Sequence, residues 1–213
     1  MNNRLSEKVE MIPIIYKILS KNIKIKKENF ESFKYGENNL LNEENLSMKS
    51  RLMENDIIVM GFSAGGELAV NLIFNKEKQE EFNIDKSVFK GLITLSGVLD
   101  FEKCTSKHSI NLIKNYIGQD FSIHDTNPIR MLDKWYLDKT YDIPILSLHG
   151  GKDPLINLEN SISFINKINF LGGNSKLKIL KDRYHSDVIS LIISKREKES
   201  RIILDFIEDI WKG

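Results

Sequence analysis

The sequence predicts a doubly wound α/β fold with a mostly parallel sheet, and three observations predict it. Short apolar runs bounded by turn residues recur along residues 56–213. Helical patterns separate these runs, as expected of βαβ crossovers. The runs also lack polar alternation through most of their length, which is typical of strands buried on both faces of a parallel sheet. In such sheets the functional groups gather at the carboxyl ends of the strands.

Four segments are the strand candidates: residues 57–60, 92–95, 145–148 and 177–180. The fourth alternates apolar residues with lysines, which predicts a place near an edge of the sheet. Helices are expected after the first and third strands and at the C-terminus, where apolar residues recur three or four positions apart. These residues are Leu68, Ala69, Leu72 and Ile73, then Leu158, Ile162, Ile165 and Ile168, and finally Ile203, Phe206, Ile207 and Ile210.

Composition and charge are those of an ordinary globular domain. The 213 residues suit one domain, and 41% hydrophobic with 29% charged residues can form a core. A net charge of +1 gives no sign of a nucleic-acid or polybasic membrane partner. The single cysteine, Cys104, excludes an intrachain disulfide. No window reaches the roughly 18 apolar residues of a membrane span, and the N-terminus is a poor secretory signal, so a cytoplasmic protein is expected.

The first strand candidate leads into a G-x-S-x-G motif. Residues 61–66 read GFSAGG, between a buried strand and a helix. This context predicts a sharp nucleophile elbow that exposes the hydroxyl of Ser63. We expect Gly61 and Gly65 to be required because Cβ atoms there would collide across the turn. The helix N-terminus would supply the N–H of Ala64 to a developing oxyanion.

An acid and a base follow in the order that a serine triad of this kind requires. Asp153 lies just after the third strand candidate, and His185 lies just after the fourth. Both would therefore share one edge of the sheet with Ser63. His185 would accept the proton of the serine hydroxyl, and Asp153 would orient the imidazole and stabilise its charged form.

Other interpretations of these residues stay open. Asp153 precedes Pro154 and could be only a turn former, and His185 could be a surface loop residue. Asp100 also follows a strand and is the reserve acid. Asp187 is expected to cap the following helix. The remaining histidines are expected to be structural, in the case of His149, or exposed, in the case of His108 and His124.

Four segments together resemble the esterase/lipase branch of the α/β-hydrolases. They are residues 61–66 (GFSAGG), 95–100 (LSGVLD), 148–153 (LHGGKD) and 184–187 (YHSD). Within that branch they are most similar to the arylformamidase-like and prenylcysteine-methylesterase-like enzymes, over roughly residues 55–213. The resemblance implies an α/β-hydrolase fold and a serine hydrolase that uses Ser63, Asp153 and His185 without a metal or organic cofactor.

The sequence departs from that family before Ser63. Related enzymes carry a His-Gly-Gly-Gly-type loop there, which completes the oxyanion hole. Residues 149–151 (HGG) come after the nucleophile, so the second oxyanion donor has no source. Residues 1–55 look mostly helical, with 22–26 as the one strand candidate. We therefore expect an N-terminally shortened fold whose elbow strand lies at a sheet edge, where a homodimer could form.

Two functions from different classes follow from these patterns. The first is a serine hydrolase that cleaves a small carboxylic ester or an aryl amide through an acyl-enzyme. Its core would be residues 56–213, with a cap-like insertion at 102–143. Aromatic residues of that insertion would either line an apolar pocket or only pack, namely Phe121, Trp135 and Tyr136. The alternative is a catalytically impaired hydrolase that serves as a binding or scaffold protein.

Overall fold

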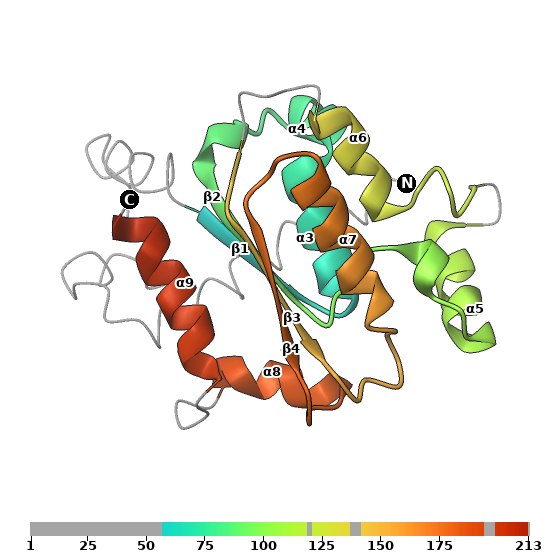
Figure 1. Ribbon diagram of the computed structural model, residues 1–213. Helices are drawn as coiled ribbons and strands as arrows, with labels where there is room; N and C mark the ends of the chain where they lie inside the picture. The colour runs from blue at the N-terminus through green and yellow to red at the C-terminus, as the bar shows by residue number, and fades with distance from the viewer. Residues whose placement is uncertain (1–56, 119–120, 137–141, 194–198, 213) are drawn as a thin grey trace, which may run out of the picture.

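A parallel β-sheet forms the centre of the computed structural model, which describes residues 57–118, 121–136, 142–193 and 199–212 (Figure 1). The strands are β1 (Ile57–Phe62), β2 (Phe89–Leu95), β3 (Ile145–Gly150) and β4 (Ser175–Leu180). They lie in the order β1-β2-β3-β4, and every neighbouring pair is parallel. This sheet confirms the predicted fold class and all four strand candidates.

The strands follow the hydropathy of the sequence. Leu92 and Ile93 of β2 are fully buried and point to opposite faces, where they join separate core clusters. β3 is buried along its whole length, as its uninterrupted apolar pattern predicted. β4 lies at one end of the sheet, and its Lys176 and Lys178 are exposed. Among the described strands, β4 thus has the expected position at an edge.

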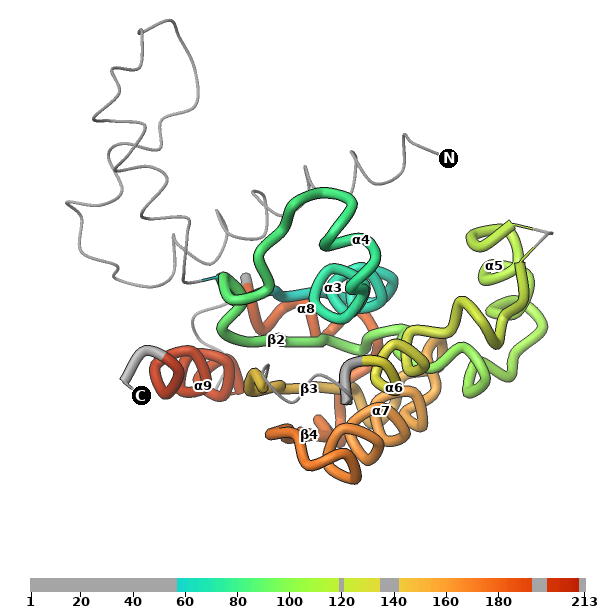
Figure 2. Tube along the Cα trace, turned by 90° about the horizontal axis from the view of Figure 1, so that it is seen from above, coloured from blue at the N-terminus to red at the C-terminus, as the bar shows by residue number. Residues whose placement is uncertain are grey.

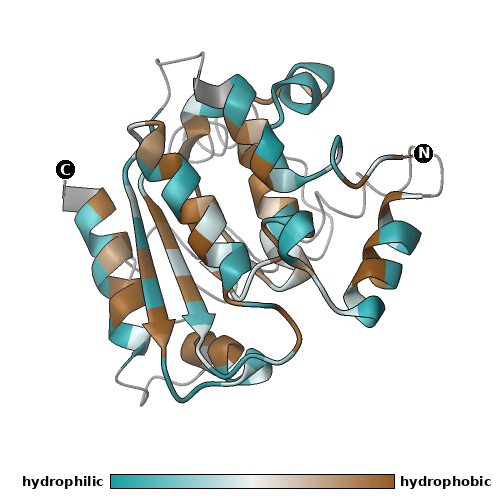
Figure 3. Cartoon of the chain, turned by 45° about the vertical axis from the view of Figure 1, so that its right-hand side comes forward, coloured by the Kyte–Doolittle hydropathy of each residue, from teal (hydrophilic) through white to brown (hydrophobic). Residues whose placement is uncertain are grey.

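Helices cover both faces of the sheet (Figures 1 and 2). They are α3 (Ala64–Phe74), α4 (Lys76–Glu81), α5 (Lys107–Ile117), α6 (Met131–Tyr136), α7 (Glu159–Phe170), α8 (His185–Ile193) and α9 (Ser200–Lys212). Buried residues of α3, α6 and α7 share one core cluster, and those of α8 and α9 share the other. Polar and apolar residues alternate along α7 and α9, as helices with one buried face require (Figure 3).

The predicted cap-like insertion, residues 102–143, falls between β2 and β3. Its helix α5 stands at the side of the molecule and packs on a small cluster of its own, formed by Phe101, Cys104 and Ile113 (Figure 1). Further along, Ile129 and Leu132 join the large cluster of α3 and α7. Phe121 is exposed, and the side chains of Trp135 and Tyr136 lie outside what the structure describes.

Some expectations concern residues that the structure does not describe. The N-terminal segment 1–55, its strand candidate at 22–26 and with them the expected shortening of the fold lie outside the described residues. Of the described helices, none combines the length and apolarity needed to cross a bilayer.

Candidate active site

Ser63 lies in a strained turn between β1 and α3. Its φ of 54° and ψ of −122° are unusual for a residue with a side chain, and such backbones cost of order 1–3 kcal/mol. Hydrogen bonds on both sides hold the turn. The Ser63 N–H donates to Leu95 O at 2.9 Å, and Ser63 O accepts from the N–H groups of Gly66 at 2.9 Å and Val98 at 3.1 Å. Ser63 is also the N-cap of α3, yet its hydroxyl makes no capping bond and stays free for another partner.

The glycines of the elbow have different roles from those expected. A Cβ on Gly61 would overlap the carbonyl oxygen of Gly65, so Gly61 is required as predicted. A Cβ on Gly65 would meet no atom within 4 Å, and the expected collision there is wrong. The close approach occurs one residue later, where a Cβ on Gly66 would lie 2.8 Å from the Cα of Gly97. Gly66 therefore lets α3 start directly against the loop that follows β2.

The structure brings Ser63, His185 and Asp153 into a hydrogen-bonded row. His185 Nε2 lies 2.9 Å from Ser63 Oγ, and His185 Nδ1 lies 2.6 Å from Asp153 Oδ2. A carboxylate only accepts, so Nδ1 carries the proton and Nε2 is free to accept the proton of the serine hydroxyl. Neither of the two downstream side chains is open to water: that of Asp153 is 0% exposed and that of His185 9%. This is the arrangement in which an imidazole can activate a serine.

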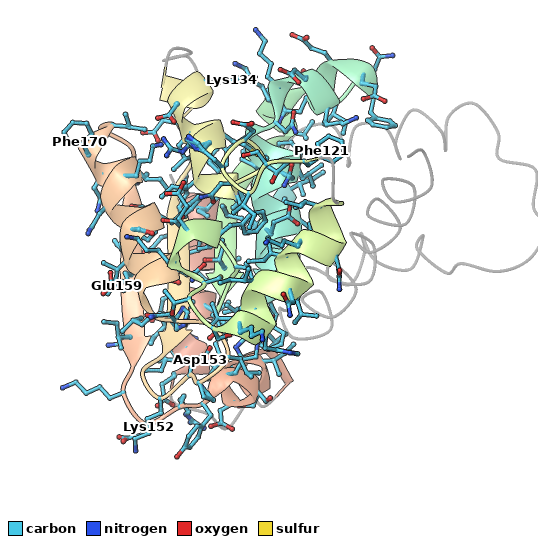
Figure 4. The ribbon with its side chains drawn as sticks, turned by 90° about the vertical axis from the view of Figure 1, so that its right-hand side faces the viewer. Phe121, Lys134, Lys152, Asp153, Glu159 and Phe170 are labelled. Carbon is cyan, nitrogen blue, oxygen red and sulfur yellow. The ribbon has the colours of Figure 1, made fainter. Side chains whose placement is uncertain are left out.

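Two glycines bring the acid and the base together. The loops after β3 and β4 touch, because the N–H of Gly151 donates to Leu180 O at 2.8 Å and that of Lys152 donates to Arg183 O at 3.0 Å. A Cβ on Gly150 would lie 2.6 Å from Arg183 O, and one on Gly151 would lie 2.9 Å from the Cα of Lys181. Figure 4 shows Asp153 among these loops, with Lys152 pointing outwards from the same turn. Because Gly150 and Gly151 lack a Cβ, the loops after β3 and β4 can lie directly against each other.

Asp153 is held as a carboxylate. Burial alone would raise its pKa, but hydrogen bonds from His185 and from the N–H groups of Ile156 and Leu155 outweigh it and lower the pKa below the ordinary 3.8. Both N–H groups donate to Asp153 Oδ1 at 2.9 Å, which leaves Oδ2 for His185. The negative charge needed to stabilise an imidazolium is therefore in place at neutral pH.

Phe62 is a site residue that the sequence interpretation missed. Its ring packs against the imidazole of His185, with centroids 4.9 Å apart and planes tilted by 40°. Phe62 occupies the variable position before the serine in the motif, where nothing in the pattern asks for an aromatic ring. The imidazole therefore has a packing contact with Phe62 in addition to its hydrogen bond with Asp153.

The predicted oxyanion donor, Ala64, is the first residue of α3. The first N–H groups of a helix have no intrahelical acceptor, so this amide is of the kind that can bind an oxyanion. The described residues before Ser63 are those of β1 alone, and they contain no glycine-rich loop.

Asp100, the reserve acid, lies in a separate buried network. Its Oδ1 accepts from Glu102 N at 3.1 Å and Asn127 Nδ2 at 2.8 Å, and its Oδ2 accepts from Ser163 Oγ at 2.8 Å. The buried Asn160 accepts from the N–H groups of Leu99 and Asp100. Asp100 therefore anchors the loop after β2, and Asp153 is the carboxylate that meets His185.

The expectations for the remaining histidines agree with the structure, and that for Asp187 does not. Asp187 is an exception, since it lies in the first turn of α8 and not before the helix, and there its Oδ2 accepts from Tyr184 N at 2.8 Å. His149 is fully buried, while His108 and His124 are exposed. Across the described residues, no group of three or more His, Cys, Asp or Glu side chains is placed to hold a metal ion.

Fold and site together define an α/β-hydrolase of the esterase/lipase type, as the resemblance predicted. The family BD-FAE matches residues 45–168, which is more than half of the chain, so this protein belongs to the BD-FAE family. The matched region includes Ser63 and Asp153 and ends before His185. No curated protein is similar enough to match the chain.

Solved structures share the fold at low sequence identity. Acylaminoacyl peptidase from Pyrococcus horikoshii is 18% identical with a TM-score of 0.56, over 77% of this chain and 26% of the peptidase. Esterase B from Lactobacillus rhamnosis is 17% identical with a TM-score of 0.57, over 74% of this chain and 54% of the esterase. A carboxylesterase from Lactobacillus plantarum is 13% identical with a TM-score of 0.54, over 77% of this chain and 63% of that enzyme. The chain thus spans about a quarter of the peptidase and about half of Esterase B.

Proposed function

We propose that this protein is a serine hydrolase that cleaves a small carboxylic ester, or an aryl amide, through an acyl-enzyme. The observation that carries the proposal is the row from Ser63 Oγ to His185 Nε2 and from His185 Nδ1 to Asp153 Oδ2, at 2.9 Å and 2.6 Å. The similarity of the fold to an esterase and a carboxylesterase supports it.

Acylation begins with Ser63. As Ser63 Oγ attacks the substrate carbonyl, His185 Nε2 takes the hydroxyl proton, and Asp153 stabilises the imidazolium that forms. The carbonyl oxygen of the tetrahedral intermediate becomes an oxyanion that the N–H of Ala64 can bind. When the intermediate collapses, the bond to the leaving group breaks and His185 returns the proton to the departing oxygen or nitrogen. Ser63 is then left as an ester.

Deacylation repeats these steps with water. His185 takes a proton from the water as the water oxygen attacks the acyl carbonyl, and the second tetrahedral intermediate expels Ser63 Oγ. His185 returns the proton to Ser63, which frees the carboxylic acid and restores the resting hydroxyl.

A fluorophosphonate probe tests the proposal without knowledge of the substrate, because it reacts only with an activated serine. We expect one labelled peptide, containing Ser63, and no labelling of Ser63→Ala. Ser186→Ala is the matched control, since Ser186 is exposed and adjacent to His185, and it should label like the wild type. A folded wild-type protein that does not label would contradict the proposal and favour the impaired hydrolase with a binding role.

A further inference from the structure

His149 is a fully buried histidine that the proposed mechanism does not use. It lies near the end of β3, and both ring nitrogens have partners. Nε2 lies 3.0 Å from Ile156 O, and Nδ1 lies 2.8 Å from Ser161 Oγ. A carbonyl oxygen only accepts, so Nε2 carries the proton and donates to Ile156. A neutral ring then leaves Nδ1 to accept the hydroxyl proton of Ser161.

Burial, as the largest influence, lowers the pKa of His149 below its ordinary 6.5, which agrees with a neutral ring. A charged ring would need to donate from both nitrogens. The Ile156 carbonyl, which only accepts, fixes the tautomer with the proton on Nε2, and the Ser161 hydroxyl adapts to it by donating to Nδ1.

Ile156 connects His149 to the acid of the triad. The carbonyl of Ile156 is held by His149, and its N–H donates to Asp153 Oδ1 at 2.9 Å. Asp153 Oδ2, which binds His185, also lies 3.5 Å from His149 Nε2. The ring of His149 thus lies against the turn 153–156, next to both the Ile156 carbonyl and the Asp153 carboxylate.

We infer that His149 is a positioning residue that holds the turn 153–156 so that Asp153 Oδ2 faces His185. The inference rests on the proposed function of the triad. Its physical basis is the bond to the Ile156 carbonyl, which fixes one of the two residues whose N–H groups orient Asp153 Oδ1. An apolar side chain of similar size would fill the same space but would leave that buried carbonyl without a partner.

Two conservative variants distinguish the roles of the two ring nitrogens of His149. In His149→Gln the side-chain amide reaches the place of Nε2 and can still donate to Ile156 O. In His149→Asn the shorter amide reaches only the place of Nδ1 and can satisfy Ser161 but not Ile156. Displacement of a supporting group by about 1 Å can cost about 10² in rate. We therefore expect His149→Asn to lose about 10² in kcat with KM little changed, and His149→Gln to stay within a few-fold of the wild type.

A spectroscopic readout distinguishes positioning from a general loss of packing. The proton on His185 Nδ1 should give a low-field NMR resonance because it is shared with Asp153. We expect this resonance in the wild type and in His149→Gln, and its loss in His149→Asn while the thermal midpoint shows a folded protein. The inference would be overturned if His149→Gln and His149→Asn had the same kcat and the same intensity of this resonance, whether both values are near the wild type or both are reduced.

Failure of the proposed function would look different. A wild type that shows the resonance but neither labels nor turns over substrate contradicts the hydrolase, and the resonance in the two variants still tests the positioning. Should His149→Asn not fold, Ser161→Ala replaces it, because loss of the hydroxyl removes the partner of His149 Nδ1 and loosens the ring that holds Ile156. A weaker resonance in Ser161→Ala would then support the inference, and an unchanged one would overturn it.

Discussion

The N–H of Val98 donates to the carbonyl oxygen of Ser63 at 3.1 Å, so the loop after β2 holds the backbone of the nucleophile. The same loop touches α3 through the close approach of Gly97 and Gly66. Its far side is fixed by Asn160 and Asp100. The positive φ of Ser63 is therefore maintained by contacts from a second strand and from a helix that lies about a hundred residues further along the chain.

The two glycines that flank Ser63 in the motif should respond differently to alanine. Gly61→Ala forces a Cβ onto the backbone of Gly65, and overpacking of this kind costs about 1–3 kcal/mol or more. Gly65→Ala meets open space and lies within α3, so its stability should match or exceed that of the wild type. Urea unfolding measures both. Similar losses in the two variants would contradict the geometry of the elbow.

His185→Ala should abolish most esterase activity while the chain stays folded. Loss of a triad member in comparable enzymes costs roughly 10⁴ to 10⁶ in turnover. The matched control is His108→Ala, because His108 is exposed and far along the chain from the site. Turnover of a chromogenic ester, with circular dichroism as the check on folding, decides the outcome. A His185→Ala variant with near wild-type turnover would exclude His185 as the base.

Substitution of the two candidate acids should have different effects, on catalysis for Asp153 and on stability for Asp100. Asp153→Asn should reduce kcat by up to about 10⁴, less than His185→Ala, because an amide cannot stabilise the imidazolium. Asp100→Asn should instead lower the free energy of unfolding by about 1–3 kcal/mol, since its new NH₂ group faces donors from Asn127 and Ser163. Comparison of kcat and urea midpoints tests this. Greater damage to kcat from Asp100→Asn would refute our choice of acid.

Stability should fall on the acid side of neutrality because of His149. Burial lowers the pKa of His149 below 6.5, so below pH 6.5 the unfolded chain takes up a proton that the folded chain refuses. The contribution of His149 to the free energy of unfolding is complete above pH 6.5. It declines as the pH falls towards the lowered pKa, by at most about 1.4 kcal/mol per pH unit. Asp153, whose pKa is lowered below 3.8, adds a further loss as the pH falls below that value. Urea unfolding at pH 7 and pH 5 should show the first effect in the wild type but not in His149→Gln.

We expect two copies of the chain to pair through β1. β1 pairs with β2 along one edge, and no strand of the described part of the chain pairs with its other edge. Light scattering should show a mass that rises from monomer to dimer with concentration, and the outer amides of β1 should exchange more slowly in the dimer. If the protein is a monomer at every concentration and the outer amides of β1 are equally protected throughout, another part of the same chain covers this edge.

The sequence allowed most of the fold and the three triad residues to be predicted, because both depend on local patterns. Continuous apolar runs mark β1 to β3, and Ser63, Asp153 and His185 each follow a strand end. The supporting contacts could not be predicted, since they join residues far apart in the sequence. The hydrogen bond from the N–H of Leu99 to Asn160 Oδ1 and the packing of Phe62 on His185 depend on how loops and side chains meet in space. For the same reason the motif could not show that Gly66, and not Gly65, makes the close approach.

The two ends of the described sheet differ, and this difference limits how copies can assemble. Alternating lysines of β4 would repel another strand, whereas β1 carries only apolar residues and a glycine. A molecule in which only β1 can pair with another strand can join one further copy. The two β1 strands would then pair about a two-fold axis, which leaves neither of them open to a third copy. In the expected pair, the outermost of the described strands would be the two copies of β4, with their exposed lysines. We therefore expect pairing through β1 to stop at two copies, because the lysines of β4 disfavour the addition of another strand there.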